Sequence, residues 1–213
     1  MTPARSRPRG GPAHVAFRFL IVLAGTQPLV WRRILVPPSY SFWDLHVAIQ
    51  DAMGWEDRHL HEFEIVTDSD EPPVRIGIPS PEIPADRRPL AGWGHSVADV
   101  FRDHGSMARY LYDFGDDWVH AVIFEGIEPK APKGRLPRCI GGAGACPPED
   151  CGGPPGYERL LEILADPEHE EYEEMLAWVC GKFDPAAFDP AKVRFDDPGK
   201  RFEVAFGERA GEP

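Results

Sequence analysis

Two neighbouring runs of alternating hydrophobic residues near the N-terminus constrain the fold of this chain more than any other feature. The run 15–23 places Phe17, Phe19 and Ile21 on one face, as expected for a β-strand with one buried side. A turn over 25–28 separates this run from a second strand-like run over 30–36. The pattern therefore predicts a β-hairpin.

An amphipathic helix is predicted directly after the hairpin. Ser41, with Asp44 three residues later, is typical of a helix N-terminus. Apolar residues then recur at helical spacing, and Gly54 is placed to end the helix in a left-handed conformation. A strand over 60–67 follows. The resulting ββαβ order predicts an α+β fold with a roll-like mixed or antiparallel sheet, and by analogy its start is similar to a β-grasp.

The middle of the chain combines an irregular segment with a second hairpin. Residues 68–96 lack periodicity and include the proline-rich stretch 71–89, which predicts a long loop, and Ser96 is placed to cap a short helical turn over 97–101. Strands over 108–114 and 118–127 flank Gly115 and Asp116, which suit a two-residue type II′ turn. This register pairs Asp113 with Trp118 and makes Asp113 and His120 diagonal neighbours on one face.

Helices are predicted for the C-terminal part, over 157–165 and 167–180. Of four Asp-Pro pairs, the one at Asp166 is expected to start the second helix, because Asp is a good N-cap and Pro suits the first helical position. Between residues 158 and 189 ten acidic residues face two basic ones, which is typical of a solvated helical surface. We expect one domain over 14–193, a flexible basic tail over 1–13 and a C-terminal tail over 194–213.

Charge and hydrophobicity limit the classes of function that this chain can have. The chain of 213 residues has a formal net charge of −12, which excludes a pervasive basic surface for nucleic acid. It lacks the roughly 20 consecutive apolar residues needed to span a bilayer. Arg18 interrupts the apolar run near the N-terminus, which argues against a signal peptide and favours a cytoplasmic location. In that compartment clustered cysteines indicate metal ligands or plain thiols before disulfides.

Two groups of polar residues are candidates for catalysis or metal binding. His59 and His61 alternate along the predicted strand, so both side chains are expected on the same side, where they suit a shared ligand or metal. Histidines that are simply hydrogen-bonded at a sheet edge would give the same pattern. Asp113 beside His120 would raise the pKa of the imidazole, which suits a general base, a metal site or a structural ion pair.

The third candidate is a cysteine-rich loop with Cys139, Cys146 and Cys151. Six and four residues separate these cysteines, which differs from the two-residue spacing of common zinc fingers. The loop can still be expected to bring three thiolates around one structural zinc, with the fourth ligand open. The alternatives are small buried cysteines in a tight loop, or a cysteine nucleophile activated by His120.

Several of these motifs together resemble the plasmid pRiA4b ORF-3-like family, over about residues 14–193. The resemblance implies an α+β roll-like domain from bacterial or archaeal plasmids and insertion elements, without an established activity. Some members have a resolvase-like name, but this chain has no recombinase serine motif. The motifs that carry the resemblance are Pro28–Pro37, Leu45–Trp55, His59–Phe63, Tyr110–His120, Pro137–Gly153 and Gly156–Pro185.

We favour the hypothesis of a non-enzymatic binding or adaptor domain with a protein partner, with Trp55, Asp116 and Trp118 as candidate surface residues. The alternative is a metal-dependent hydrolase or nuclease that uses the four residues His59, His61, Asp113 and His120. An enzyme requires these four groups to meet in a water-accessible cleft, whereas an adaptor allows them to be buried and mutually satisfied. The oligomeric state stays open.

Overall fold

The first hairpin forms as the alternating pattern predicts. In the computed structural model, which describes residues 15–66, 72–129 and 135–207, β1 (Ala16–Leu23) pairs antiparallel with β2 (Val30–Val36), with Leu23 opposite Val30. Phe17, Phe19, Ile21 and Leu23 are all buried. The hairpin belongs to a sheet of eight strands in the order β5-β4-β3-β6-β7-β1-β2-β8.

Every pair of neighbouring strands is antiparallel except the parallel pair β4–β5. The α+β class is therefore confirmed. The chain does begin with ββαβ, but β6 and β7 lie between β3 and β1, and the likeness to a β-grasp is not confirmed. The remaining strands are β3 (His61–Ile65), β4 (Val74–Gly77), β5 (Leu90–Ala91), β6 (Met107–Tyr112), β7 (Trp118–Glu128) and β8 (Arg138–Ala143).

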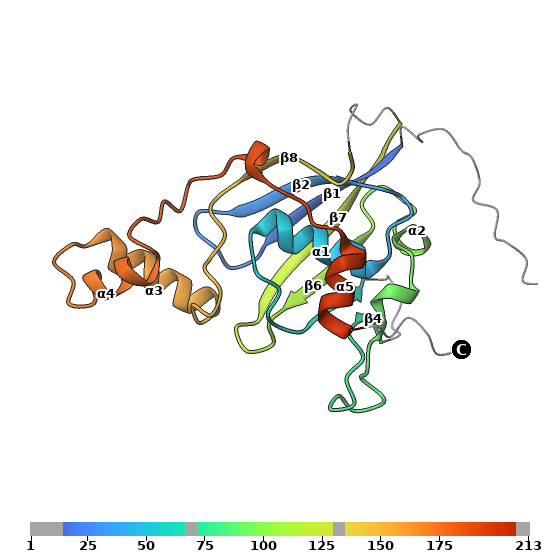
Figure 1. Cartoon of the computed structure of the whole chain (residues 1–213), viewed down its shortest axis with the longest axis horizontal. Helices are drawn as coiled ribbons and strands as arrows, with labels where there is room; N and C mark the ends of the chain where they lie inside the picture. The colour runs from blue at the N-terminus through green and yellow to red at the C-terminus, as the bar shows by residue number, and fades with distance from the viewer. Residues whose placement is uncertain (1–14, 67–71, 130–134, 208–213) are drawn as a thin grey trace, which may run out of the picture.

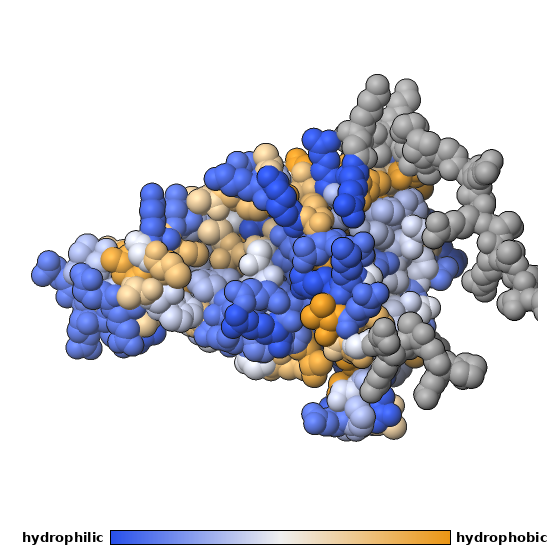
Figure 2. Space-filling view, in the orientation of Figure 1, coloured by the Kyte–Doolittle hydropathy of each residue, from blue (hydrophilic) through white to orange (hydrophobic). Residues whose placement is uncertain are grey.

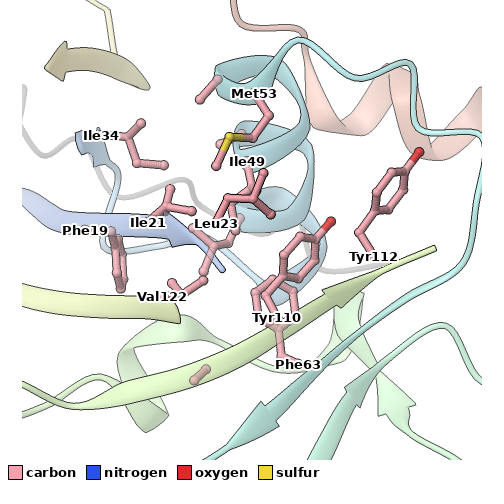
Figure 3. Packing of buried hydrophobic residues seen from close by; sticks show 14 of the residues in the cluster. Phe19, Ile21, Leu23, Ile34, Ile49, Met53, Phe63, Tyr110, Tyr112 and Val122 are labelled. Atoms are coloured by element: carbon pink, nitrogen blue, oxygen red, sulfur yellow. The ribbon is translucent and has the colours of Figure 1, made fainter. Parts of the chain in front are cut away.

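Helix α1 (Phe42–Met53) lies across one face of the sheet, where its apolar stripe covers the buried face of the hairpins (Figure 1). Ser41 and Asp44 form the predicted capping box, and Gly54 ends the helix with a φ of 96°. Ile49 and Met53 point into a cluster that contains Ile21, Ile34 and Val122 (Figure 3). Burial of this apolar area is the main source of stability for such a two-layer arrangement.

The predicted long loop over 68–96 is wrong in part, because β4 and β5 extend the sheet there. β4 pairs with β3, and Arg75 on β4 forms an ion pair with Glu64 on β3 at 2.9 Å. The short elements η1 (Gly92–Gly94) and α2 (Val97–Val100) follow, and Ser96 caps α2 as expected. Prolines are tolerated around β4 and β5 because these strands lie at the edge of the sheet.

The register predicted for the second hairpin is also wrong. β6 ends at Tyr112, which pairs with Trp118, while Tyr110 pairs with His120. Residues 113–117 form a longer turn, in which Asp113 and Asp117 adopt left-handed conformations with φ of 57° and 55°. Asp is one of the few residues that tolerate this conformation, and the strand ends two residues earlier than a two-residue turn would allow.

The C-terminal helices begin at different residues from those predicted. α3 (Gly153–Ala165) starts earlier than expected, and Asp166 lies at its C-terminal end instead of starting the next helix, α4 (Tyr172–Trp178). Asp189 caps the short helix η2 (Pro190–Lys192), and Asp197 caps α5 (Pro198–Phe206). The predicted C-terminal tail thus includes a helix, and α5 packs against α1, whereas the predicted tail 1–13 lies outside the described residues.

Candidate functional site

The four residues His59, His61, Asp113 and His120 do not form one site. His61 stacks on His46 in the interior, with ring centroids 3.4 Å apart, and His120 is fully buried beside Trp55. Because the register differs from the predicted one, Asp113 lies near His59 and not diagonal to His120. Two separate histidine–carboxylate clusters result, one half-exposed and one buried.

The half-exposed cluster, called here the open site, consists of His59, Asp113, Glu149 and Asp150. The Nε2 atom of His59 lies 2.9 Å from Asp150 Oδ1, 3.5 Å from Glu149 Oε2 and 3.6 Å from Asp113 Oδ2. His59 precedes β3, Asp113 begins the turn after β6, and the two acidic residues follow β8. The three sequence motifs considered as candidates therefore contribute to one site.

Backbone geometry holds the acidic residues of the open site in place. Asp113 Oδ1 accepts a hydrogen bond from the Gly115 N–H at 2.9 Å, and the Asp113 N–H donates to the Leu60 carbonyl at 3.0 Å. Asp150, like Asp113, has a positive φ, of 58°. Non-glycine residues in this conformation cluster at functional sites, where surrounding contacts must maintain them.

The cysteine-rich loop is docked onto the turn between β6 and β7. The Gly152 N–H donates to Asp116 Oδ2 at 3.1 Å, and a Cβ atom on Gly153 would lie 2.3 Å from the Asp116 carbonyl oxygen. Glycine at residue 153 is thus required for the close approach that brings Glu149 and Asp150 to His59. Asp116, a candidate surface residue, has this structural role in a partly exposed position.

The open site is exposed mainly at Asp150. His59 is 29% exposed at its side chain and Asp150 58%, while Asp113 and Glu149 are mostly covered. The Nε2 atom of His59 is buried, and among the described residues it has no hydrogen-bond partner, although Asp150 Oδ1 lies 2.9 Å away as an ion-pair contact. Donor atoms of His59, Asp113 and Asp150 all lie within 4.8 Å of one another, which is compatible with one shared divalent cation.

Glu149 lies beside that trio and is held by two further groups. Its Oε1 atom accepts hydrogen bonds from the Glu56 N–H at 2.7 Å and from the Tyr112 hydroxyl at 3.0 Å. The carboxylate is therefore fixed with one oxygen toward His59. Sequence reasoning missed Glu149 and Asp150, although the Pro-Pro-Glu-Asp-Cys sequence in the cysteine-rich loop contained the signal.

The buried cluster, called here the closed network, links side chains of α1, β6 and α5. Gln50 donates to the Tyr110 hydroxyl at 2.9 Å, and the hydroxyl is then free to donate to His46 Nδ1 at 2.8 Å. With Nδ1 as acceptor, His46 Nε2 donates to Asp57 Oδ1 at 2.8 Å, and Arg201 pairs with Asp57 Oδ2 at 2.9 Å. The members of this network are His46, Gln50, Asp57, His61, Tyr110 and Arg201.

The protonation states in the closed network follow from burial. Burial lowers the pKa of His46 and lowers that of His61 further, so both imidazoles are neutral near pH 7. Burial opposes ionisation of Asp57, but hydrogen bonds and charge interactions with His46 and Arg201 outweigh it and lower the pKa of Asp57. Donor atoms of His46, Asp57 and His61 also lie within 4.8 Å of one another, yet His46 already has a partner at each nitrogen.

The three cysteines predicted as zinc ligands lie in different environments. Cys139 is buried on β8, while Cys146 and Cys151 are partly buried in the following loop. Burial raises the pKa of all three thiols, to about 12 for Cys151, which favours protonated sulfur. Within the described ranges, no group of three potential ligands that share a 4.8 Å neighbourhood includes a cysteine. The geometry gives the predicted zinc site no support.

The candidate surface residues Trp55 and Trp118 are not exposed, which corrects the prediction that they anchor a partner. Their exposed fractions are 5% and 1%, because Trp55 stacks on Tyr112 and both rings belong to the core cluster. Trp93 is 42% exposed and packs against Phe202 and Phe206 of α5. No helix in the part of the chain that the structure describes is long and apolar enough to cross a membrane.

Comparisons with known proteins found a matching family model, a curated relative and a similar solved structure. The family model described as plasmid pRiA4b ORF-3-like protein matches residues 15–192. An uncharacterized protein, y4hQ, from Sinorhizobium fredii is 37% identical over 187 residues, which cover 86% of this chain and 88% of that protein. The crystal structure of a protein of unknown function, MM3350 from Methanosarcina mazei Go1, has a TM-score of 0.73 and 42% identity, and the match covers 85% of this chain and 98% of that one.

Proposed function

The chain belongs to the plasmid pRiA4b ORF-3-like family, and we propose that within this family it works as a metal-dependent hydrolase whose cation binds at the open site. One observation carries the proposal: three carboxylates from two distant segments surround a histidine nitrogen that has no hydrogen-bond partner. Like charges held this close favour a cation between them, because a cation reduces their mutual repulsion.

His59, Asp113 and Asp150 are the proposed ligands. A site with one imidazole and two carboxylates suits Zn²⁺ or Mn²⁺, since both ions accept nitrogen and oxygen ligands. These residues supply three ligands, which leaves coordination positions for water or a substrate on the exposed side of Asp150. This donor set replaces the four-residue set predicted from the sequence, and it does not involve the three cysteines.

A divalent cation in such a site lowers the pKa of a bound water toward neutrality and so supplies hydroxide for hydrolysis. Glu149 Oε2 lies 3.5 Å from His59 Nε2, and the Tyr112 hydroxyl donates to the same carboxylate, so Glu149 would serve as the proton acceptor for a water on the bound cation. The net charge of −12 disfavours a nucleic acid as the substrate. The proposal is therefore a hydrolase for substrates other than nucleic acids.

The test is isothermal titration of the purified full-length chain with MnCl₂ and with ZnCl₂. We expect one site in the wild type and a loss of affinity of at least about 10-fold in Asp113→Asn. The matched control is Asp117→Asn, because Asp117 lies in the same turn with nearly the same φ but outside the open site. Equal affinities for both variants, or no binding by the wild type, would overturn the proposal.

Hydrolysis is tested on the metal-loaded wild type with p-nitrophenyl acetate and bis-p-nitrophenyl phosphate as probes. We expect turnover that is lost in Asp113→Asn and retained in Asp117→Asn. Metal binding without turnover of either probe would contradict the proposed hydrolase activity and support only cation binding.

A further inference from the structure

The helices α3 and α4 form an arm that projects from one end of the sheet (Figure 1). Helix α3 contributes the buried core residues Tyr157 and Leu160, while Met175 of α4 packs against the core but is only partly buried. None of the residues of α4 is fully buried. A cavity of about 410 Å³ lies between the two helices and borders Asp150 of the open site. A helix that buries so little of its own surface, beside a cavity of this volume, is a candidate binding surface.

The cavity has an excess of negative charge. Its lining includes Asp150, Glu171 and Glu174, against the single cation Arg159. Arg159 is already paired with Glu171 at 2.5 Å, and in the described part of the chain Glu174 has no ion pair. The surrounding segment 158–189 has ten acidic residues against two basic ones. The resulting negative potential attracts cationic groups and repels anionic ones.

An apolar floor and an exposed indole complete the cavity. Leu160, Ile163 and Met175 line it, and Trp178 at its rim is 44% exposed. Figure 2 shows a hydrophobic patch enclosed by hydrophilic residues at this end of the molecule. The face of a tryptophan binds ammonium and guanidinium groups, and an apolar floor accommodates the methylene stem of a long basic side chain.

We propose that the cavity between α3 and α4 binds a lysine or arginine side chain of a partner protein. Glu174 pairs with the charged group, Trp178 covers it, and Leu160, Ile163 and Met175 contact the aliphatic stem. This interaction does not require a cation in the open site, so each proposal can fail without the other. The proposed partner of the acidic surface of the arm is therefore a basic peptide segment.

The test is fluorescence anisotropy with a fluorescein-labelled Lys-Gly-Lys-Gly-Lys peptide and the full-length chain at low ionic strength. We expect saturable binding that weakens about fivefold in Glu174→Gln and about 10-fold in Trp178→Ala. The matched control is Glu173→Gln, which removes the same charge from the exposed face of α4 outside the cavity. Its affinity is expected to stay within about twofold of the wild type.

Three results would overturn this proposal. Equal losses in Glu173→Gln and Glu174→Gln would indicate general charge attraction without a site. Unchanged affinity in Trp178→Ala would show that the peptide binds outside the cavity. Equal binding of a peptide with norleucine in place of lysine would show that recognition does not depend on the charged group. Asp113→Asn distinguishes this interaction from the proposed hydrolase, because it removes a proposed metal ligand and is expected to leave peptide affinity unchanged.

Discussion

The open site and the closed network contain the same residue types but have opposite environments. Asp57, His59 and His61 are neighbours in the sequence, yet His59 belongs to the open site and the other two to the closed network. In the closed network each nitrogen of His46 has a partner, and Arg201 neutralises Asp57. In the open site His59 Nε2 has no hydrogen-bond partner and no arginine pairs with the three carboxylates in the described residues.

This difference suggests a structural role for the closed network and is consistent with the ligand site proposed for the open site. In the closed network the charge of Asp57 is compensated by Arg201 and both nitrogens of His46 are paired, so loss of these contacts affects stability, although Gln50 Oε1 and His61 Nδ1 have no hydrogen-bond partner in the described residues. A half-exposed cluster whose carboxylates have no arginine or lysine partner in the described residues contributes little stability, and its geometry is compatible with an external cation. The following predictions test this distinction through the free energy of unfolding.

The largest effect is expected at low pH for His120, which lies beside the closed network with its ring centroid 5.2 Å from Tyr110. Burial lowers the pKa of His120 to about 4, so the unfolded chain binds a proton on this residue at a higher pH than the folded chain. Stability from this group is therefore complete above about pH 6.5 and is lost as the pH falls to about 4. The loss amounts to about 3 kcal/mol.

The measurement compares urea unfolding of the wild type and His120→Phe at pH 7 and pH 4. Carboxylates and the other histidines titrate in both proteins, so the difference between the two isolates His120. Between pH 7 and pH 4, we expect the free energy of unfolding of the wild type to fall by about 3 kcal/mol more than that of His120→Phe. The same difference at both pH values would contradict a neutral, buried His120.

The next prediction compares Tyr110 and Tyr112, two residues apart on β6, whose hydroxyl groups belong to different clusters. Tyr110→Phe removes the partner of His46 and Gln50 in the closed network and leaves two buried polar groups unsatisfied, at a cost of about 2 kcal/mol. Tyr112→Phe removes a hydroxyl that donates to Glu149 and accepts from the Arg58 N–H at the open site. Tyr112 is 1% exposed, but Glu149 also accepts from the Glu56 N–H, so its carboxylate keeps a partner. We expect a loss below about 1 kcal/mol for that variant.

Both losses are measured by guanidinium chloride unfolding at pH 7. Equal losses of unfolding free energy for the two tyrosine variants would contradict the proposed difference between the closed network and the open site. A larger loss for Tyr112→Phe would assign the structural role to the open site instead.

The smallest change in stability is expected for Asp113→Asn. Asparagine tolerates the left-handed conformation, and its amide oxygen can accept the hydrogen bond from Gly115 that Asp113 accepts now. Removal of one charge also reduces repulsion with Asp150. Thermal unfolding of this variant is expected to stay within about 0.5 kcal/mol of the wild type, and a loss above about 2 kcal/mol would make Asp113 a structural residue.

Local patterns in the sequence predicted a large part of the fold. The β1–β2 hairpin, the capping box at Ser41 and the left-handed Gly54 depend on neighbouring residues, and all three are confirmed. β4 and β8 were missed because their pairing partners lie elsewhere in the chain. The turn after β6 was misread because Gly115 and Asp116 suit a short turn, whereas the left-handed Asp113 and Asp117 produce a longer one.

The candidate site was only half predictable for a related reason. His59 was singled out with His61 because the two alternate along a strand, and Asp113 was singled out as a neighbour of His120, whereas the structure brings His59 and Asp113 together. His46 and Gln50, four residues apart on the buried side of α1, offered a signal that the apolar stripe masked. The role of Arg201 had no signal in the sequence, because nothing in its own segment indicates that α5 packs against α1.

The sequence by itself determined the class of fold, the elements with local start and stop signals, the acidic character and the residues capable of chemistry. The tertiary structure alone decided which of those residues meet, which are buried and which stay accessible. The physical reason is that alternation and helical spacing are local properties, whereas ligand distances and pKa values depend on strand register and on segments far away in the chain. Asp57 and His59, two residues apart, differ in role because Arg201 reaches one and Asp150 the other.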